Sequence, residues 1–437
     1  MKRSLALVVL ALSLSGTALA QDPEIPFDEF YLDNGLRVIV HEDRKAPIVA
    51  VTVWYHVGSK NEAPGKTGFA HLFEHLMFNG TENYNDEYFR PLQEVGATST
   101  NGTTDFDRTN YFQTVPTSAV DLALWLESDR MGHLLGAVDQ AKLDEQRGVV
   151  QNEKRQGDNA PYGKVFETIV TNLFPPGHPY SWEVIGSMED LNAATLEDVK
   201  TWFETYYGPN NATLVLAGDI DVATAREKVE RYFGDIPPGP PLTHKERFIP
   251  SSVPASRIVM QDRVPEARIY KVWLAPEWIS DETTHLQLAD LVLTSGKSSR
   301  LYQRLVYEDQ IATDASAFLM SNEIAGAYIA YATVRDGQEM SAVEQALDEE
   351  LARFLAEGPT SDELERARTE IRSAFIRGVE QVGGFNGKSQ ILAENAVYGG
   401  RPDFYKHSLE VLNGARREQV LAAARKWIDG EPLVIEV

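Results

Sequence analysis

Two histidines and a glutamate stand close together in the segment KTGFAHLFEHLMFNG, residues 66–80. His71 and His75 are four residues apart, so on a helix they lie one turn apart and differ by about 40° in direction, which allows both imidazoles to bind one metal ion. Glu74 directly precedes the second histidine and can act as general base on a metal-bound water. This is the inverted zinc motif HxxEH, and it predicts Zn²⁺ chemistry. The motif alone also fits a helix with two structurally satisfied histidines.

A catalytic zinc site needs a third protein ligand and one open position. The chain has no cysteine, so the ligand must be a histidine or a carboxylate. On a helix over residues 141–157, Glu153 falls on the stripe that contains Gln146 and Val150, where an unpaired carboxylate would be costly without a cation. Glu145 points away from this stripe and fits an exposed helix charge. We therefore favour Glu153 as the third ligand.

The elements that position these residues repeat within the chain. Residues 37–54 resemble residues 257–273, with matching arginines and matching tryptophans about 220 residues apart. Alternating apolar segments predict strands, and segments with helical periodicity follow them in each half. We expect an α+β fold of two homologous domains, each a mainly antiparallel sheet with helices packed on one face. The expected strands are 36–40, 48–57, 210–219, 255–262, 267–275, 312–320 and 325–334, and the expected helices are 118–132, 141–156, 194–206, 221–233, 281–295, 338–357 and 361–381.

The repeat and the proline distribution also predict the domain limits. Residues 1–20 join two basic residues to an apolar run and a small-residue cleavage pattern, which indicates a signal peptide and a periplasmic protein. A membrane anchor is the weaker alternative, because a bilayer span needs about 20 apolar residues. We expect an N-terminal zinc-binding catalytic domain at 22–234, a proline-rich linker at 235–254, and a C-terminal homologous domain without a metal motif at 255–437.

The charge balance excludes one class of partner. Asp and Glu number 65 against 41 Lys and Arg, for a formal net charge of −24, so the basic footprint of a nucleic-acid-binding protein is absent. No later segment approaches spanning length, so we expect no membrane span in the mature chain.

Taken together, HLFEH and the later Glu153 in RGVVQNEKRQ resemble the pitrilysin/insulinase family of inverted-motif zinc metallopeptidases, especially its two-domain members of the bacterial processing-peptidase type. The resemblance covers nearly the whole mature chain. It rests on these further segments: NGLRVIV, GSKNE, GFAHLFEHLMFNGT, NGTTDFDRTNY, HPYSWEVIGS, YYGPNNATLVLAGDI and SSRLYQRL.

The resemblance implies roles for particular residues. His71, His75 and Glu153 would hold one Zn²⁺ per chain, and Glu74 would be the general base. Asn101 and Gly102 would lie near a substrate-facing edge strand, where a peptide can add by β-augmentation. His178 would shape the site wall. The two domains would form half of a clam-like chamber.

Two positions depart from the family pattern. Many members carry a second glutamate where this chain has Gln146, which could orient Glu153 or a water but supplies no charge. Members that work alone usually carry an Arg and, seven residues later, a Tyr that hold the substrate backbone, and the matching positions here are Val306 and Thr313. We therefore expect a heterodimer in which a homologous subunit supplies the Arg/Tyr pair.

The sequence favours a zinc-dependent endopeptidase that hydrolyses peptides or unfolded segments. The alternative is a non-catalytic scaffold or assembly subunit of the same fold, which need not retain all four site residues. A periplasmic peptide-binding protein shares the two-lobed plan but gives no reason for the zinc residues.

Overall fold

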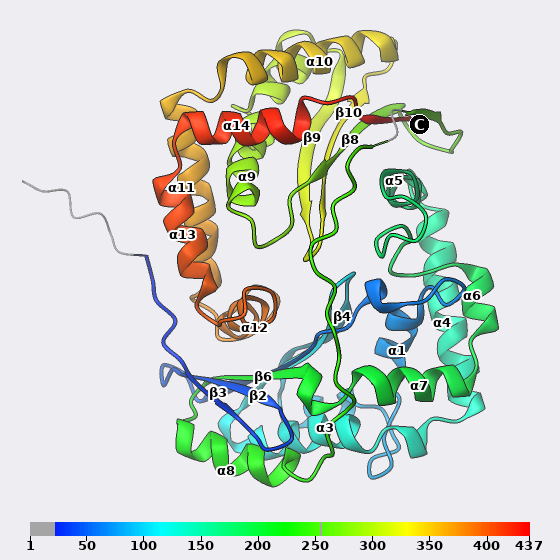
Figure 1. Ribbon diagram of the computed structural model, residues 1–437, viewed down its shortest axis with the longest axis vertical. Coiled ribbons are helices and arrows are strands. Elements are labelled where there is room, and N and C mark those ends of the chain that lie inside the picture. The colour runs from blue at the N-terminus through cyan, green and yellow to red at the C-terminus, as the bar shows by residue number, and fades with distance from the viewer. Residues whose placement is uncertain (1–21, 254–255) are drawn as a thin grey trace, which may run out of the picture.

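The computed structural model describes residues 22–253 and 256–437, so the expected signal peptide at 1–20 lies outside the described residues. These residues form two sheets with helices around them (Figure 1). Residues 235–253 contain neither helix nor strand and connect the part with the first sheet to the part with the second. Within the described ranges, no helix is long and apolar enough to cross a membrane.

The first sheet has six strands in the order β1-β2-β6-β3-β5-β4. Neighbouring strands are antiparallel except β2 and β6, which are parallel. The central strand β3 has the nearly continuous apolar sequence IVAVTVWY and is buried along almost its whole length, as expected for a strand covered on both faces. β4 is the last strand of the sheet, so one of its edges pairs with no other strand of the described chain. The strands are β1 (Asp28–Tyr31), β2 (Arg37–Glu42), β3 (Ile48–Tyr55), β4 (Thr98–Thr104), β5 (Thr109–Pro116) and β6 (Ala212–Gly218).

The second sheet repeats this plan with five strands in the order β7-β11-β8-β10-β9. Its one parallel pair, β7 with β11, occupies the same place as β2 with β6 in the first sheet. The predicted fold class, two homologous α+β units with mainly antiparallel sheets, is therefore confirmed. The strands are β7 (Ser256–Val259), β8 (Arg268–Ala275), β9 (Ala312–Ser321), β10 (Gly326–Val334) and β11 (Leu433–Glu436).

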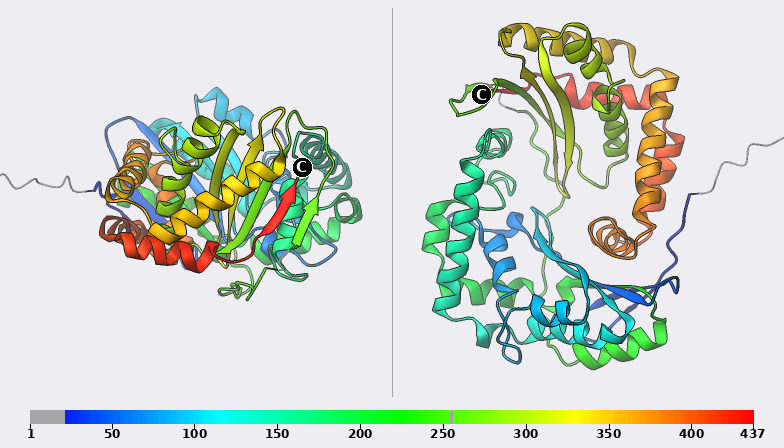
Figure 2. Two further views of the ribbon diagram at one scale, coloured as in Figure 1. Left: turned by 90° about the horizontal axis from the view of Figure 1, so that it is seen from above. Right: turned by 180° about the vertical axis from the view of Figure 1, so that it is seen from behind.

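Helices cover both sheets and connect them at the sides. α3 and α8 pack on the first sheet, and α9, α10 and α14 pack on the second. α11 and α13 run along one side of the molecule between the sheets, and α4 runs along the other (Figure 2). A π-helical segment, η5 (Tyr302–Glu308), precedes β9. The helices are α1 (Phe69–Leu76), α2 (Phe89–Glu94), α3 (Val120–Gly132), α4 (Gln140–Asp158), α5 (Val165–Leu173), α6 (Met188–Ala193), α7 (Leu196–Tyr206), α8 (Val222–Phe233), α9 (Asp281–Thr294), α10 (Met340–Glu357), α11 (Ser361–Gly378), α12 (Lys388–Tyr398), α13 (Phe404–Gly414) and α14 (Arg417–Ile428).

Each half also sends one helix onto the sheet of the other half. α5 packs on β8 and β11, whereas α12 packs on β3 and β6. At the start of α12, the Thr52 hydroxyl donates to Ser389 Oγ at 2.9 Å, and Trp54 Nε1 donates to Gln390 Oε1 at 2.6 Å. The helices of each half cover one face of its own sheet, as expected. The other face of each sheet is also apolar, and it is buried by the helix that comes from the other half.

A buried ion cluster also joins the halves. Lys60 is only 1% exposed, and its Nζ lies 3.0 Å from Asp107 of the first half and in contact with Glu323 of the second. His56 Nε2 lies 2.7 Å from the same Glu323 carboxylate. Because a buried lysine is stable only when it is paired, this cluster fixes the position of the β9–β10 turn against the first sheet.

Candidate active site

The HxxEH segment forms the short helix α1. Its apolar residues are buried in the core of the first half, while His71, Glu74 and His75 lie on the less buried side. The helix begins after Gly68, whose φ of +87° is left-handed, and a Cβ on Gly68 would lie 2.7 Å from the carbonyl oxygen of Ile185. Glycine is therefore needed for the sharp turn that leads into the helix.

The N-terminus of α1 is held by the buried carboxylate of Glu62. The backbone N–H groups of Gly68 and Ala70 donate to its two oxygens at 3.2 and 2.8 Å, and Trp182 Nε1 donates at 2.8 Å. Burial raises the pKa of Glu62, and the N–H donors oppose this rise. Glu62 satisfies helix N–H groups that have no partner within the helix, and so fixes where α1 begins.

His71, His75 and Glu153 converge on one point. The Nε2 atoms of the two histidines are 3.3 Å apart, and the nearest oxygen of Glu153, on α4, lies 3.7 Å from the first and 3.5 Å from the second. Within residues 22–253 and 256–437, this is the only group of three or more His, Asp or Glu residues close enough to share a metal ion. Helices α1 and α4, about 70 residues apart in the chain, pack against each other and so bring the donors together.

This donor set fits Zn²⁺. Two ligands at 2.0–2.1 Å from a tetrahedral zinc lie about 3.4 Å apart, which is close to all three observed separations. Burial, with help from the neighbouring His75, lowers the pKa of His71 to about 4, so its imidazole is neutral at physiological pH and keeps a lone pair for a metal. Two histidines and one carboxylate leave a fourth position open, as in catalytic rather than structural zinc sites.

Glu74 is placed between the metal ligands and the edge strand β4. The hydroxyl of Thr104, the last residue of β4, donates to Glu74 Oε2 at 2.6 Å. Burial raises the pKa of the Glu74 carboxyl, and the Thr104 hydroxyl and His75 oppose the rise. A raised pKa makes this carboxylate a better proton acceptor, which is what a general base requires.

Asn101 and Gly102 both lie in β4, at the edge of the sheet. Asn101 is exposed, whereas Gly102 faces the sheet's buried side, where a Cβ would lie 2.8 Å from the Phe78 ring. The pairing of β4 with β5 is irregular between Thr98 and Asn101, and Ser99 there has a φ of +52°. Bulges of this kind occur at sheet edges and next to active sites.

The position of Glu153 corrects one step of the sequence argument. Its stripe on α4 was expected to face the apolar side, and Leu143 and Val150 on that stripe are indeed fully buried. The Glu153 side chain, however, is 44% exposed. The stripe leaves the core near the end of the packed segment, so Glu153 reaches the histidines from the solvent side and is not a buried charge that demands a cation.

Two further expectations are corrected. Gln146 is half-buried on α4, and among the described residues its side chain forms no hydrogen bond with Glu153, so it does not orient that carboxylate directly. His178 is 1% exposed, and both ring nitrogens are engaged, with the Phe248 carbonyl at 2.7 Å and the Tyr180 N–H at 3.0 Å. His178 thus packs in a core and has no free surface for a site wall.

Sequence reasoning missed Glu62 and Thr104. Neither lies in a segment with helical or strand periodicity, so nothing marked them individually. Both belong to segments that the family resemblance covered, GSKNE and NGTTDFDRTNY, and an acidic residue shortly before a motif helix was the one available signal for Glu62.

Two family models match the chain. The model described as "Insulinase (Peptidase family M16)" matches residues 37–178, and the model described as "Peptidase M16 inactive domain" matches residues 193–371. The chain is 28% identical over 412 residues to "Zinc protease PqqE" of Helicobacter pylori, and the aligned region covers 91% of this chain and 90% of that protein. It is 24% identical over 364 residues to the "Probable mitochondrial-processing peptidase subunit beta" of Schizosaccharomyces pombe, with coverage of 80% and 78%.

Solved structures show the same fold. A protease from Helicobacter pylori superposes with a TM-score of 0.84 at 24% identity, covering 95% of this chain and 99% of that one. A "peptidase M16 inactive domain" from Pseudomonas fluorescens gives a TM-score of 0.83 at 18% identity, with coverage of 94% and 97%. The periplasmic protease PqqL from Escherichia coli gives 0.73 at 19% identity, and this chain spans only 47% of its length.

The chain has two repeated α+β units, and its HxxEH motif lies on a helix beside an edge strand. These features place it in the class of zinc-protease-like half-chambers. With both halves matched by models of one family, the chain belongs to the insulinase family, peptidase family M16.

Proposed function

We propose that this chain is a zinc-dependent endopeptidase that hydrolyses peptides or unfolded segments, and that it works in the periplasm after removal of residues 1–20. His71, His75 and Glu153 hold one Zn²⁺ per chain. The observation that carries the proposal is the convergence of their donor atoms, 3.3 to 3.7 Å apart, directly beside the carboxylate of Glu74. The relatives named as zinc proteases support the same activity.

The chain's own residues divide the work. Bound Zn²⁺ supplies Lewis-acid activation of the scissile carbonyl and acidifies the attacking water. Glu74 takes the proton of that water and returns it to the leaving amine. The Thr104 hydroxyl holds one oxygen of Glu74 and leaves the other free for this transfer. The free edge of β4 binds the peptide backbone in extended form.

The test is a Glu74→Gln variant, with Glu87→Gln as control because Glu87 is an exposed glutamate outside the site. We expect both variants to retain one equivalent of zinc by elemental analysis. Only Glu74→Gln should lose hydrolysis of a quenched fluorescent peptide, by about a hundredfold or more, the usual contribution of a general base. Wild-type cleavage rates in Glu74→Gln would refute the mechanism.

The second candidate function is a non-catalytic subunit of the same fold. The words "inactive domain" in one family model favour it for residues 193–371, although the residues of the candidate zinc site lie outside that match. Metal content separates the two functions. One equivalent of zinc that is lost in His71→Ala supports the enzyme, and absence of bound zinc in the wild-type chain supports the scaffold.

A homologous partner completes the proposed enzyme. Val306 lies in η5 and packs against the hydrophobic core of the second half. The Thr313 hydroxyl donates to the Glu266 carboxylate at 2.7 Å. Neither residue can offer a guanidinium or a phenol to a substrate backbone. We therefore expect the purified chain alone to cleave peptides weakly, and a homologous subunit with the Arg/Tyr pair to raise the rate as a heterodimer. Full activity of the homogeneous chain would contradict this expectation.

A further inference from the structure

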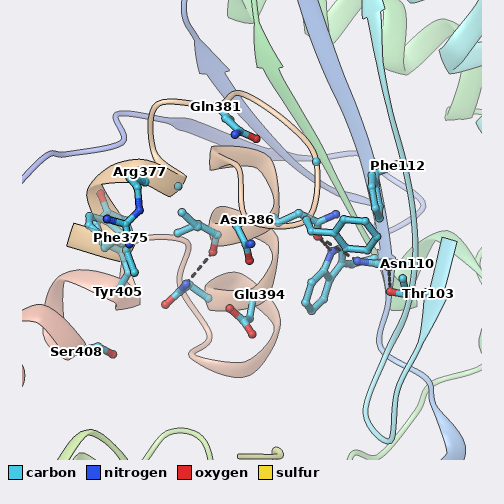
Figure 3. A pocket seen from close by; sticks show the side chains of 18 of the residues that line it. Thr103, Asn110, Phe112, Phe375, Arg377, Gln381, Asn386, Glu394, Tyr405 and Ser408 are labelled. Atoms are coloured by element: carbon cyan, nitrogen blue, oxygen red, sulfur yellow. Dashed lines mark hydrogen bonds between the residues drawn. The ribbon is translucent and has the colours of Figure 1, made fainter. Parts of the chain in front are cut away.

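A cavity of about 1100 Å³ lies between the face of the first sheet opposite α1 and the helices α11, α12 and α13 (Figure 3). We call it the sheet–helix cavity. Pockets that hold drug-sized ligands have about 300–1,000 Å³, so it has room for several side chains of a peptide. Its walls are partly aromatic, and Phe112, Phe375 and Tyr405 all lie around it.

The edge strand leads from Glu74 into this cavity. Along β4, Thr104 and Gly102 face α1 and its neighbours, whereas Asn101 and Thr103 line the cavity. At about 3.3 Å per residue, Asn101 lies about 10 Å along the strand from Thr104. A peptide paired with the free edge of β4 would therefore point every second side chain towards the cavity within a few residues of the cleaved bond.

Among the described residues that line the cavity, Glu394 is the only acidic one. Glu394 projects from α12 into the space (Figure 3), and its carboxylate forms no hydrogen bond or ion pair with any residue of 22–253 or 256–437. Burial raises the pKa of Glu394 to about 7, and Arg108 opposes this rise. A half-buried carboxylate without a partner is costly, so a structural role does not explain Glu394.

The two arginines of the cavity wall do not neutralise Glu394. Arg108 is occupied, since it donates to Thr103 O at 2.9 Å, lies 3.8 Å from Asp105 and stacks over Trp54 at 5.4 Å. Arg377 is exposed at the end of α11 and makes no ion pair with Glu394. The carboxylate is therefore free to bind a cation that enters from outside.

We propose that the sheet–helix cavity is a specificity pocket that receives a lysine or arginine side chain of a bound peptide, with Glu394 as the counter-charge. This proposal rests on the proposed peptidase function. The aromatic wall suits the same ligand, because the methylene stem of a basic side chain packs on apolar surface and its cation is attracted to aromatic faces.

The test uses quenched fluorescent decapeptides of Ala, Ser and Leu in which one Lys is moved a position at a time, with a matched set carrying Met. We expect the wild-type chain to cleave the Lys peptide with a kcat/KM ten- to a hundredfold higher than that of its Met counterpart, which is the ratio that a charge-assisted hydrogen bond provides. This preference should occur at one position of the peptide, or at two positions that are two residues apart and so point to the same face. In Glu394→Gln that ratio should fall towards one, and in Glu394→Lys it should invert. Glu380→Gln, an exposed glutamate outside the cavity, should keep the wild-type ratio. A ratio unchanged in Glu394→Gln, or no preference in the wild-type chain, would overturn the proposal.

A binding measurement separates this proposal from the peptidase function. Fluorescence anisotropy of the labelled Lys and Met peptides on the Glu74→Gln chain, with and without Glu394→Gln, needs no hydrolysis. If tighter binding of the Lys peptide depends on Glu394 while the wild-type chain cleaves nothing, the pocket stands and the peptidase function fails. If the wild-type chain cleaves the peptides but shows no selectivity that depends on Glu394, the peptidase function stands and the pocket fails. Equal binding of both peptides, or binding of neither, overturns the pocket.

Discussion

Replacing Glu62 with alanine should weaken both the fold and the metal site, because this carboxylate holds the start of α1. Its removal leaves three donors without an acceptor, namely the buried N–H groups of Gly68 and Ala70 and the partly buried Trp182 indole. Each unsatisfied buried donor costs about 1–3 kcal/mol, and such costs are not fully additive. We expect a loss of about 3–5 kcal/mol, a large share of the roughly 5–15 kcal/mol that stabilises a typical protein. Since α1 carries two of the proposed ligands, zinc affinity should fall about ten- to a hundredfold.

The assay combines urea unfolding with zinc affinity from chelator competition. Glu62→Gln keeps one acceptor oxygen and should lie between alanine and wild type in both measurements, which keeps the test valid if Glu62→Ala does not fold. Glu87→Ala, at an exposed glutamate, is the matched control and should stay within about 0.5 kcal/mol of wild type. If Glu62→Ala unfolds at the wild-type urea concentration and binds zinc equally well, the capping argument is wrong.

Three further changes test other parts of the structure. The pKa of Glu394 is raised from 4.5 to about 7, so the folded state holds the proton more tightly, and stability should decline by on the order of 3 kcal/mol as pH rises from 4.5 to 7. Glu394→Gln should remove this decline in urea unfolding at pH 5 and pH 8, and parallel pH profiles would contradict it. Gly102→Val places a side chain against Phe78 and should cost about 1–3 kcal/mol and reduce peptide cleavage, measured by thermal unfolding and kinetics. Lys60→Met removes the lysine that pairs with the buried Asp107 and the partly buried Glu323 and should cost about 3–5 kcal/mol, whereas an unchanged melting temperature would show that the ion cluster does not join the halves.

The sequence predicted those elements whose periodicity reflects packing within one half. The helix expected at 141–156 is α4 (Gln140–Asp158), and the strand expected at 325–334 is β10 (Gly326–Val334). In these segments the apolar residues that make the pattern are also the residues that enter the core. The HxxEH spacing likewise carries its own geometry, since residues four apart on a helix must be neighbours.

Elements that depend on distant partners could not be predicted in this way. β4 has the sequence TSTNGTT, with no apolar alternation, and it is a strand because β5 pairs with it. The position of Glu153 shows the same limit. A helical stripe tells which side chains share a face, but only the packing of α4 against α1 decides where along that face the core ends.

The internal repeat explains why one half carries the candidate metal site and the other the candidate specificity pocket. With a spacing of about 220 residues, α1 and α4 correspond to α9 and α11, and both pairs pack together. The place of Glu153 on α4 is taken on α11 by Ala374, which lines the sheet–helix cavity. In the second half, the helix pair therefore has no carboxylate at the ligand position, and the small residue leaves space beside α12. Under the two proposals made above, a single position on equivalent helices provides a metal donor in one half and room for a bound peptide in the other.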